Sequence, residues 1–494
     1  MKILVAIANY GYKNDGYLSR LLSEYRSMPY EIDIVVTTNV GKELGKDVEL
    51  VVGLPSKNPH SLPFAHKRIF AERKSTYDLF VYTEDDILIT QRNIEAFLRV
   101  TRILPRGELA GFFRWEQYPD GRKYYPDVHA FYRWIPDSAK TVGDHTFARF
   151  SNEHSGCYAL TRPQLAHAIE SGGFVVPPHE YKYGLLESAA TDPYTQCGFR
   201  KVICVSHFDD FLVPHLPNKY VGSRLGVDAP EFAVQMERLL QPRKSKNSSL
   251  LEPETRVFHC EWSKNYYEPC REDLIGVFPP NTRKVLSIGC GWGKTEGELV
   301  RHGIEVTAIP LDSLIAACAE SRGVEIVYGS LESAAAELLG RRFDCVLMSG
   351  ILHLLREPTK TLSYATTLLT ERGVLVATVP AFRRLPFLWL WLRHPSRYKG
   401  WQDFQRSGVQ PVGRRQLRNW FRNAGLSLEP TPRSIASRLR AVAQCGLVEA
   451  LCPSEYTFVG RRTDDTKITA HLAVAGQPEP EPLMTNADGG NRIR

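Results

Sequence analysis

The chain has 494 residues and a mass of 55.9 kDa, which is long enough for two or three domains. Apolar residues make up 43% of it and charged residues 24%, and these ordinary values exclude a disordered, collagen-like or disulfide-scaffold protein. The net charge of +7 is modest for this length, so no nucleic-acid partner is expected.

The ten cysteines are scattered and form no CxxC pair, which argues against a structural zinc site or a redox dithiol and favours buried thiols in a reducing compartment. The opening segment MKILVAIANY is too short for a signal-peptide core and is typical of a first strand. No later apolar run approaches the roughly 20 residues of a membrane span. We therefore expect a cytoplasmic protein.

Two polar segments divide the chain. Residues 241–256 combine proline, serine and mixed charge and are predicted to be a linker, and residues 463–494 are predicted to be a disordered tail. Two blocks remain, 1–240 and 257–462. In both blocks, short β-branched runs alternate with amphipathic stretches, which predicts α/β domains built on parallel sheets.

The first block begins with an expected strand at 2–9, a helix at 18–25 and a strand at 31–39. A basic helix at 64–74 follows, and then a strand at 78–86. This strand ends in three adjacent acids, Glu84, Asp85 and Asp86, where open α/β sheets place their ligands. Adjacent carboxylates repel, and Mg²⁺ or Mn²⁺ would relieve that repulsion. A solvated acidic turn would have the same sequence.

The helix and strand HKRIFAERKSTYDLFVYTEDDILI resemble those of GT-A glycosyltransferases, and the resemblance covers most of residues 1–230. It implies a nucleotide-sugar-binding domain and a metal ion on the donor diphosphate. The ligands it implies are Glu84, Asp85, Asp86 and the late His215, with Asp86 favoured over Glu84 because the triplet is not a literal DxD motif.

The same resemblance suggests contacts with the donor. Ala8, Asn9 and Tyr10, at the end of the first strand, would lie beside the nucleotide base, and Lys67 and Arg73 would meet phosphate or base. The two basic residues fit a solvated helix face equally well. Two carboxylates are candidates for the general base of an inverting transfer, and the family favours the first of them: Glu187 and Asp192.

The second block opens with an expected strand at 284–290 that runs into Gly289, Gly291 and Gly293 and then a helix. Such glycines let the backbone approach a ligand at a helix N-terminus. A P-loop is excluded because its first glycine would fall on Ile288, and a dinucleotide fingerprint because the third glycine comes one residue early. Further strands are expected at 304–309, 324–329, 343–350 and 373–380.

This block resembles class I S-adenosylmethionine-dependent methyltransferases over about 257–462. Four segments carry the resemblance in the family's order: VLSIGCGWG, FDCVLMSGILHLLREP, TERGVLVATVP and RRQLRNWFRNAGLSLE. It implies that the three glycines line the methionine part of the cofactor. The family's three cofactor-binding acids are replaced by Ser287, Pro310 and Ser330, and the nearby acids that could substitute are Asp312 and Glu332. His353 is either a base in a loop or a packed helix residue.

A basic, aromatic stretch at 381–406 follows the expected strand at 373–380. From Arg372 to Arg440 there are 14 lysines and arginines against two acids. Tryptophans beside cations suit the headgroup region of an anionic membrane, so a peripheral membrane contact through 383–401 is one interpretation. A cap over the methyltransferase-like site is the other.

The sequence therefore predicts an α/β protein of two Rossmann-like domains with two activities. The first would transfer a sugar from a nucleotide-sugar donor to a glycan or lipid-linked acceptor, and the second would methylate the product, in surface polysaccharide or glycolipid synthesis. Fusion would raise the effective concentration of the intermediate. One alternative makes the second block a non-catalytic docking module. Another confines the chemistry to the methyltransferase and makes the first block an acceptor-binding domain.

Overall fold

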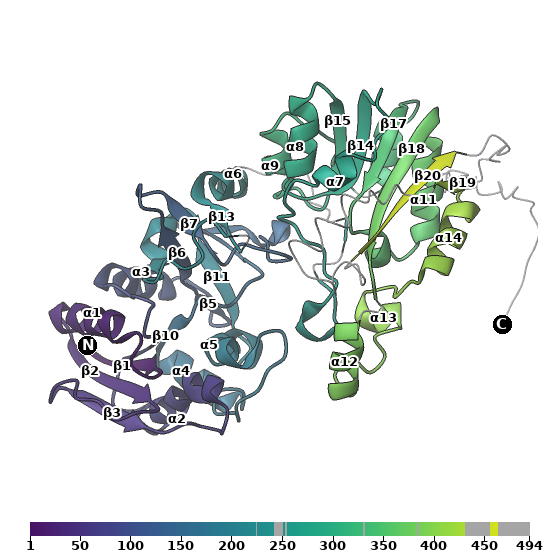
Figure 1. The fold of residues 1–494 in the computed structure, drawn as a ribbon. Coiled ribbons are helices and arrows are strands. Elements are labelled where there is room, and N and C mark those ends of the chain that lie inside the picture. Colours follow the sequence, from purple (N-terminus) through teal and green to yellow (C-terminus); the bar gives the residue numbers. More distant parts are fainter. Residues whose placement is uncertain are drawn as a thin grey trace, which may run out of the picture.

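The computed structural model describes residues 1–223, 225–241, 250–251, 254–329, 331–382, 385–429 and 455–462, without the side chains of 332, 385 and 386. Most of the region predicted as a linker, and all of the predicted tail at 463–494, lie outside these residues. Two α/β regions lie side by side, one built from the N-terminal strands and one from the C-terminal strands (Figure 1).

The N-terminal region is centred on a five-stranded sheet in the order β10-β4-β1-β2-β3. Its strands are β1 (Lys2–Asn9), β2 (Glu31–Thr38), β3 (Val48–Val52), β4 (Leu79–Glu84) and β10 (Cys157–Thr161). All pair in parallel except β10, which runs antiparallel to β4. β1 and β4 lie inside the sheet and are buried on both faces, which explains their continuous apolar runs. The associated helices are α1 (Asp15–Ser27), α2 (Ala65–Glu72), α3 (Gln91–Thr101) and α4 (Arg162–Glu170).

Two small sheets follow, and they correct the expectation of purely parallel sheets. One has the order β5-β11-β9-β8 and the other β12-β6-β7-β13, and both contain antiparallel pairs. Their strands have two to five residues, too short to show a clear period in the sequence. They are β5 (Glu108–Ala110), β6 (Phe113–Gln117), β7 (Lys123–Tyr125), β8 (Lys140–Val142), β9 (His145–Ala148), β11 (Arg200–Cys204), β12 (Leu212–Pro214) and β13 (Val227–Asp228), with α5 (Leu185–Thr195) and α6 (Ala229–Leu240) beside them.

The C-terminal region is a seven-stranded sheet in the order β16-β15-β14-β17-β18-β20-β19. The chain order reverses between β14 and β17, which creates a crevice at the carboxyl ends of these strands. β20 is antiparallel to both of its neighbours. The strands are β14 (Lys284–Cys290), β15 (Glu305–Pro310), β16 (Glu325–Ile326), β17 (Phe343–Met348), β18 (Leu369–Pro380), β19 (Leu426–Glu429) and β20 (Glu455–Arg462). β16 is shorter than the strand predicted at 324–329.

Helices connect these strands, and α12 and α13 project from one end of the sheet (Figure 1). None of the helices in the described ranges has the length and hydropathy needed to cross a membrane. The helices are α7 (Glu272–Ile275), α8 (Lys294–Arg301), α9 (Ala316–Glu320), α10 (Leu331–Glu337), α11 (Pro358–Thr367), α12 (Leu385–Arg393), α13 (Phe404–Ser407) and α14 (Arg414–Asn423).

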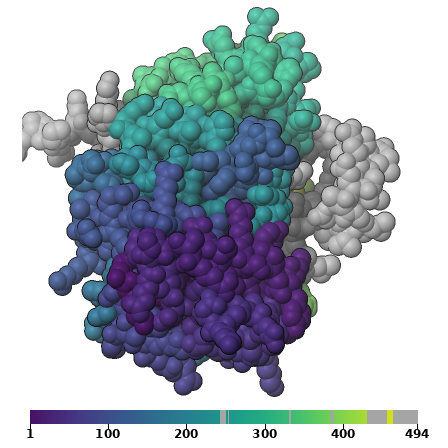
Figure 2. All heavy atoms as spheres, turned by 90° about the vertical axis from the view of Figure 1, so that its left-hand side faces the viewer, coloured from purple at the N-terminus to yellow at the C-terminus, as the bar shows by residue number. Residues whose placement is uncertain are grey.

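The two regions share one buried apolar cluster. It runs from Phe113 and Trp134 through Phe232 to Tyr266 and Leu311. Viewed from the N-terminal side, the purple N-terminal segments cover the lower part of the surface and the green C-terminal segments rise above them (Figure 2). Because the apolar core is continuous, the contact between the regions resembles the interior of a domain more than a loose interdomain contact.

Candidate functional sites

The carboxyl edge of the N-terminal sheet gathers polar side chains around Asp85. Its two carboxylate oxygens accept hydrogen bonds from the side-chain amides of Asn9, at 2.6 Å, and Asn14, at 2.7 Å. Burial raises the pKa of Asp85 to about 6, with the two amides opposing that rise. Asn9 was predicted to lie beside a nucleotide base. In the structure it holds the carboxylate of Asp85 in place.

Asp86 is the acid of the triplet that meets His215. Its Oδ2 lies 3.5 Å from His215 Nε2, and His215 Nδ1 lies 2.5 Å from a carboxylate oxygen of Glu116. Burial opposes ionisation of Asp86, but the His215 bond and the nearby cations outweigh it and hold the pKa below its usual value. Burial likewise opposes protonation of His215, yet the two acids raise its pKa. Asp86 and His215 thus come together from segments 129 residues apart.

Glu84 differs from its two neighbours. It lies behind them against Gly156, and a Cβ at that glycine would come within 3.4 Å of a Glu84 carboxylate oxygen. Burial raises the pKa of Glu84 well above its usual value, and the charge of Asp86 adds to the rise. These surroundings disfavour the ionised form of Glu84, which is the form that binds a metal ion.

The two candidate bases on α5 have different surroundings. Asp192 is fully buried and forms an ion pair with the buried Lys67, and His179 Nε2 lies 3.0 Å from its Oδ1. Because Lys67 and Asp192 pair with each other, Lys67 is not free to bind a donor phosphate and Asp192 is not free to act as a base. Glu187 is partly exposed near the start of α5, where a Cβ at Gly184 would come within 2.8 Å of its carboxylate oxygen, and its charge contributes to the raised pKa of Glu84.

The remaining predicted donor contacts lie apart from this cluster. Arg73 pairs with Glu49 of β3 through two hydrogen bonds of 2.6 and 2.7 Å. Ala8 is buried in β1, and its carbonyl accepts the backbone N–H of Asp85 at 3.1 Å. Tyr10 is half exposed just beyond the strand. Of these three residues, only Ala8 and Tyr10 lie at the edge that carries the acids.

These surroundings predict opposite outcomes for two matched substitutions on α5. If the N-terminal region catalyses the sugar transfer that its sequence resemblance implies, Glu187→Gln should lower that activity by about 10²-fold, as expected for loss of a general base, and leave the melting temperature unchanged. Asp192→Asn should lower the melting temperature, because it leaves the Lys67 ammonium buried without a countercharge. Steady-state kinetics and thermal unfolding of both variants would check this. Normal activity of Glu187→Gln would exclude Glu187 as the base.

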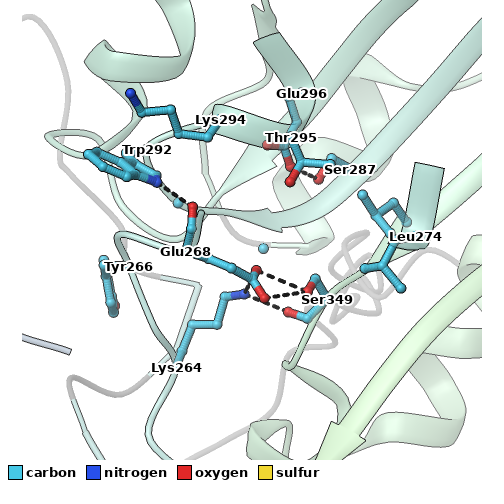
Figure 3. Close-up of a pocket in the computed structure, with 14 residues that line it drawn as sticks. Lys264, Tyr266, Glu268, Leu274, Ser287, Trp292, Lys294, Thr295, Glu296 and Ser349 are labelled. Carbon is cyan, nitrogen blue, oxygen red and sulfur yellow. Dashed lines mark hydrogen bonds and ion pairs between the residues drawn. The ribbon is translucent and has the colours of Figure 1, made fainter. Parts of the chain in front are cut away.

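The second site lies where β14 passes into α8, against residues 264–268 (Figure 3). The Glu268 carboxylate accepts hydrogen bonds from the Ser349 hydroxyl, at 3.0 Å, and from Lys264 Nζ, at 3.1 Å. Its backbone carbonyl accepts from Trp292 Nε1 at 2.5 Å. Burial opposes ionisation of Glu268, but Lys264 and Arg271 outweigh it and lower the pKa. The site therefore holds a fixed cation–carboxylate pair.

The three glycines of this loop are all closely packed by the protein itself. A Cβ at Gly291 would come within 2.3 Å of the Tyr266 carbonyl oxygen, and one at Gly293 within 2.5 Å of Ala319 Cβ. Gly289 and Gly293 also have positive φ angles, +85° and +76°. The turn and the close approach of the 264–268 segment are thus enough to explain the glycines, so the glycines alone do not indicate a bound ligand.

Asp312 follows β15 and is fully buried. One carboxylate oxygen accepts the backbone N–H groups of Leu314 and Ile315, both at 2.9 Å, and the other lies 3.2 Å from Nε of Arg133, a residue of the N-terminal region. Burial raises the pKa of Asp312, with Arg133 opposing the rise. Glu332 lies in α10, and its side chain is outside the described residues.

The groups of this site match those of S-adenosylmethionine. Lys264 suits a carboxylate, Glu268 suits an ammonium group, and Asp312 suits a pair of hydroxyls. Glu296 accepts a hydrogen bond from the Ser287 hydroxyl at 2.6 Å. It therefore places a carboxylate next to the position where the family has an acid and this sequence has Ser287. The cavity beside Lys264, Glu268 and Glu296 measures only about 20 Å³, room for little more than one water, and Asp312 does not line it. The donor set fits the cofactor, but the cavity is too small to hold it as it stands.

His353 is a packed residue in this structure. Its Nε2 lies 2.9 Å from the Trp262 carbonyl oxygen, so this nitrogen carries the proton. Burial lowers its pKa to about 4. The ring is therefore neutral at physiological pH and accepts a proton less readily than an exposed histidine.

Residues 245–431 match the family model of a methyltransferase domain. The chain is 31% identical over 175 residues to the ubiquinone biosynthesis O-methyltransferase of Xanthomonas axonopodis pv. citri, over 33% of this chain and 70% of that protein. It is 29% identical over 117 residues to an uncharacterized methyltransferase of Mycobacterium bovis, over 23% of this chain and 58% of that protein.

A solved O-methyltransferase family protein from Burkholderia thailandensis aligns at 18% identity with a TM-score of 0.28, over 39% of this chain and 55% of that one. The C-terminal region has a methyltransferase Rossmann-like fold. Through this region the chain belongs to the class I S-adenosylmethionine-dependent methyltransferase family. This bears out the prediction for the second block, and the N-terminal region is an α/β domain of unnamed type.

Sequence reasoning missed Arg133, Lys264 and Glu268. Arg133 lies in an irregular segment, 179 residues before its partner Asp312, and carries no local signal. Lys264 and Glu268 precede the glycine loop and are four residues apart, a spacing that is common for ion pairs on a protein surface. Only the fold shows that both contact Ser349 in the cofactor cavity.

Proposed function

We propose that the protein is a bifunctional glycosyltransferase and methyltransferase, in which the N-terminal domain transfers a sugar from a nucleotide donor. The observation that carries the first activity is the meeting of Asp86 and His215 at the carboxyl edge of β4. A carboxylate and an imidazole with a second acid behind it are suitable ligands for Mn²⁺ or Mg²⁺ beside a diphosphate.

In this proposal the residues of the acidic edge have separate roles. Asp86 and His215 hold the cation, which would neutralise the leaving diphosphate, and Glu116 orients the His215 ring through its 2.5 Å contact. Asn9 and Asn14 hold Asp85 in place. Glu187 accepts the proton of the attacking hydroxyl group.

The methyltransferase domain acts on the sugar or glycan made by the first. S-Adenosylmethionine supplies an electrophilic methyl group. Lys264 and Glu268 would hold the amino-acid end of the cofactor, and Asp312 the ribose hydroxyls. Relatives of this domain include enzymes named for O-methylation, which supports a hydroxyl group as the acceptor.

A second candidate function retains the glycosyltransferase and makes the C-terminal domain a docking module. It is favoured by two observations, the cavity of about 20 Å³ and the pairing of Arg133 with Asp312. Titration calorimetry with S-adenosylmethionine separates the two. Saturable heat supports the bifunctional enzyme, and no heat up to millimolar cofactor supports the docking module.

The sugar-transfer proposal predicts metal-dependent turnover of one class of nucleotide sugar. We expect the purified protein to release nucleotide from one member of a panel of UDP-, GDP- and dTDP-sugars with Mn²⁺, and to lose this activity in EDTA. The measurement is nucleotide release with and without added metal. Failure of every donor, together with no metal-dependent nucleotide binding, would reject the proposal and leave the methyltransferase as the activity.

A further inference from the structure

The C-terminal domain carries a large pocket between α12 and the segment that leads into α14. Its volume is about 480 Å³, within the range of small-molecule sites. Its walls are mainly aromatic and aliphatic side chains, and we call it the aromatic pocket: Phe382, Phe387, Leu388, Trp391, Trp401 and Val412.

Ring packing holds the inner wall of the aromatic pocket in place. Trp262 contacts Phe382, Phe387 and Trp401 with ring centroids 4.5 to 5.4 Å apart, and Phe387 and Trp401 contact each other at 5.0 Å. Such interlocked rings lose little freedom when a ligand binds. The aromatic face of the pocket is therefore preformed, and Gln402, Gln410 and Gln416 add polar groups to its other walls.

A second hollow of about 440 Å³ adjoins the first, and Gly413 and Gln416 line both. Its other walls come from the start of α14 and include Arg414 and Arg415, both exposed. Neither arginine forms an ion pair within the described part of the chain, although Arg414 lies over the Tyr456 ring at 4.3 Å. We call this the basic hollow.

The mouth of the aromatic pocket continues into an exposed apolar surface on α12. Leu388 and Trp391, which line the pocket, are 38% and 39% exposed, and the adjacent Trp389 and Leu392 are 57% and 71% exposed. An apolar chain longer than the pocket could therefore leave along this helix. Apolar walls beside unpaired guanidinium groups match a ligand with an apolar chain and an anionic group.

The aromatic pocket is linked to the methyltransferase site through two residues of its inner wall. The Phe382 ring lies 5.7 Å from the His353 ring, edge to face, and His353 in turn binds the Trp262 carbonyl group. Lys264, two residues after Trp262, lines the cofactor cavity. A ligand in the pocket would thus lie beside the carboxyl edge of the sheet that carries the cofactor site.

We propose that the two hollows together bind a lipid phosphate with a single apolar chain, for which farnesyl phosphate is a soluble probe, with the chain in the aromatic pocket and the phosphate on Arg414 and Arg415. Its identification as the lipid carrier of the methyl acceptor rests on the proposed function. The binding itself does not. The proposal is carried by the position of a 480 Å³ pocket with one aromatic face next to a hollow with two arginines.

The test uses the full chain and farnesyl phosphate below its micellar concentration, with tryptophan fluorescence and calorimetry as readouts. We expect saturable binding, weakened at least about tenfold in Leu388→Asp and in Arg415→Glu. Farnesol should bind more weakly to the wild type, and its affinity should fall in Leu388→Asp but stay unchanged in Arg415→Glu. Matched controls are Leu339→Asp, at a leucine that is 85% exposed and away from α12, and Arg418→Glu, on α14 but outside both hollows. Both variants should bind within twofold of the wild type.

Two results would overturn the proposal. One is absence of saturable binding to the soluble probe while vesicles of anionic phospholipid bind, which would assign the region to a bilayer surface. The other is an equal loss of farnesyl phosphate affinity in each variant and its matched control, which would mean that the added negative charge weakens binding wherever it is placed. S-Adenosylmethionine binding is titrated separately without the probe, so failure of the methyltransferase activity and failure of this site give different results.

Discussion

Replacing Asp86 by alanine should lower metal-dependent turnover of the nucleotide sugar by at least about 10³-fold. A cation on the donor diphosphate contributes several kcal/mol to the transition state, and each 1.36 kcal/mol corresponds to a factor of ten. Asp86 retains 15% side-chain exposure and contacts His215, whereas desolvation and the charge of Asp86 raise the pKa of Glu84 well above its usual value. The measurement is kcat/KM for nucleotide release, together with Mn²⁺ affinity by calorimetry.

The matched control for this variant is Asp120→Ala. Asp120 is an exposed acid whose ion-pair partner among the described residues is Arg122, two residues along the chain. Its removal should leave kcat/KM and Mn²⁺ affinity unchanged. Full activity of the Asp86 variant would instead favour the hypothesis that the N-terminal domain only binds an acceptor.

The central strands of both sheets could be predicted from sequence because their signal is local. β1, β4, β14 and β18 are continuous apolar runs, as strands buried on both faces must be. The small sheets between 108 and 228 could not be predicted in the same way. Their strands are short, and their order depends on pairings between segments such as β6 and β12, about 100 residues apart.

The candidate sites were predictable where one segment carries the chemistry. The acidic end of β4 and the glycine loop after β14 both lie at sheet edges, as their sequences indicated. Lys67 shows the limit of this reasoning. On a helix with several basic residues it looks like a solvated or phosphate-facing cation, yet it is 2% exposed because Asp192, 125 residues later, supplies its countercharge.

The interface between the two domains combines apolar packing with one buried charge pair. The Arg133 side chain is 3% exposed and the Asp312 side chain 1%. The Arg133 guanidinium also lies 4.8 Å from the centre of the Tyr266 ring, whose backbone N–H donates to the Ala130 carbonyl oxygen at 2.7 Å. A site proposed to bind the cofactor therefore shares Asp312 with the N-terminal domain.

Arg133→Met should lower the free energy of unfolding of the C-terminal domain by about 3–5 kcal/mol. The substitution keeps apolar contact with Tyr266 but leaves the Asp312 carboxylate buried without its cation, and an uncompensated buried charge is the costly outcome. Denaturant unfolding followed by tryptophan fluorescence measures the change. Arg149→Met is the matched control, since Arg149 is exposed on a nearby segment and its loss should cost less than about 0.5 kcal/mol.

A double-mutant cycle decides whether the cost comes from the charge. Asp312→Asn removes the carboxylate charge and keeps an oxygen that can accept the Leu314 and Ile315 N–H groups. Adding it to Arg133→Met should therefore recover most of the lost stability, because no unpaired charge remains in the interface. If the two losses simply add, Arg133 and Asp312 are not coupled, and the stability lost in Arg133→Met comes from the other contacts of the guanidinium group, such as the one with Glu254 at 3.9 Å.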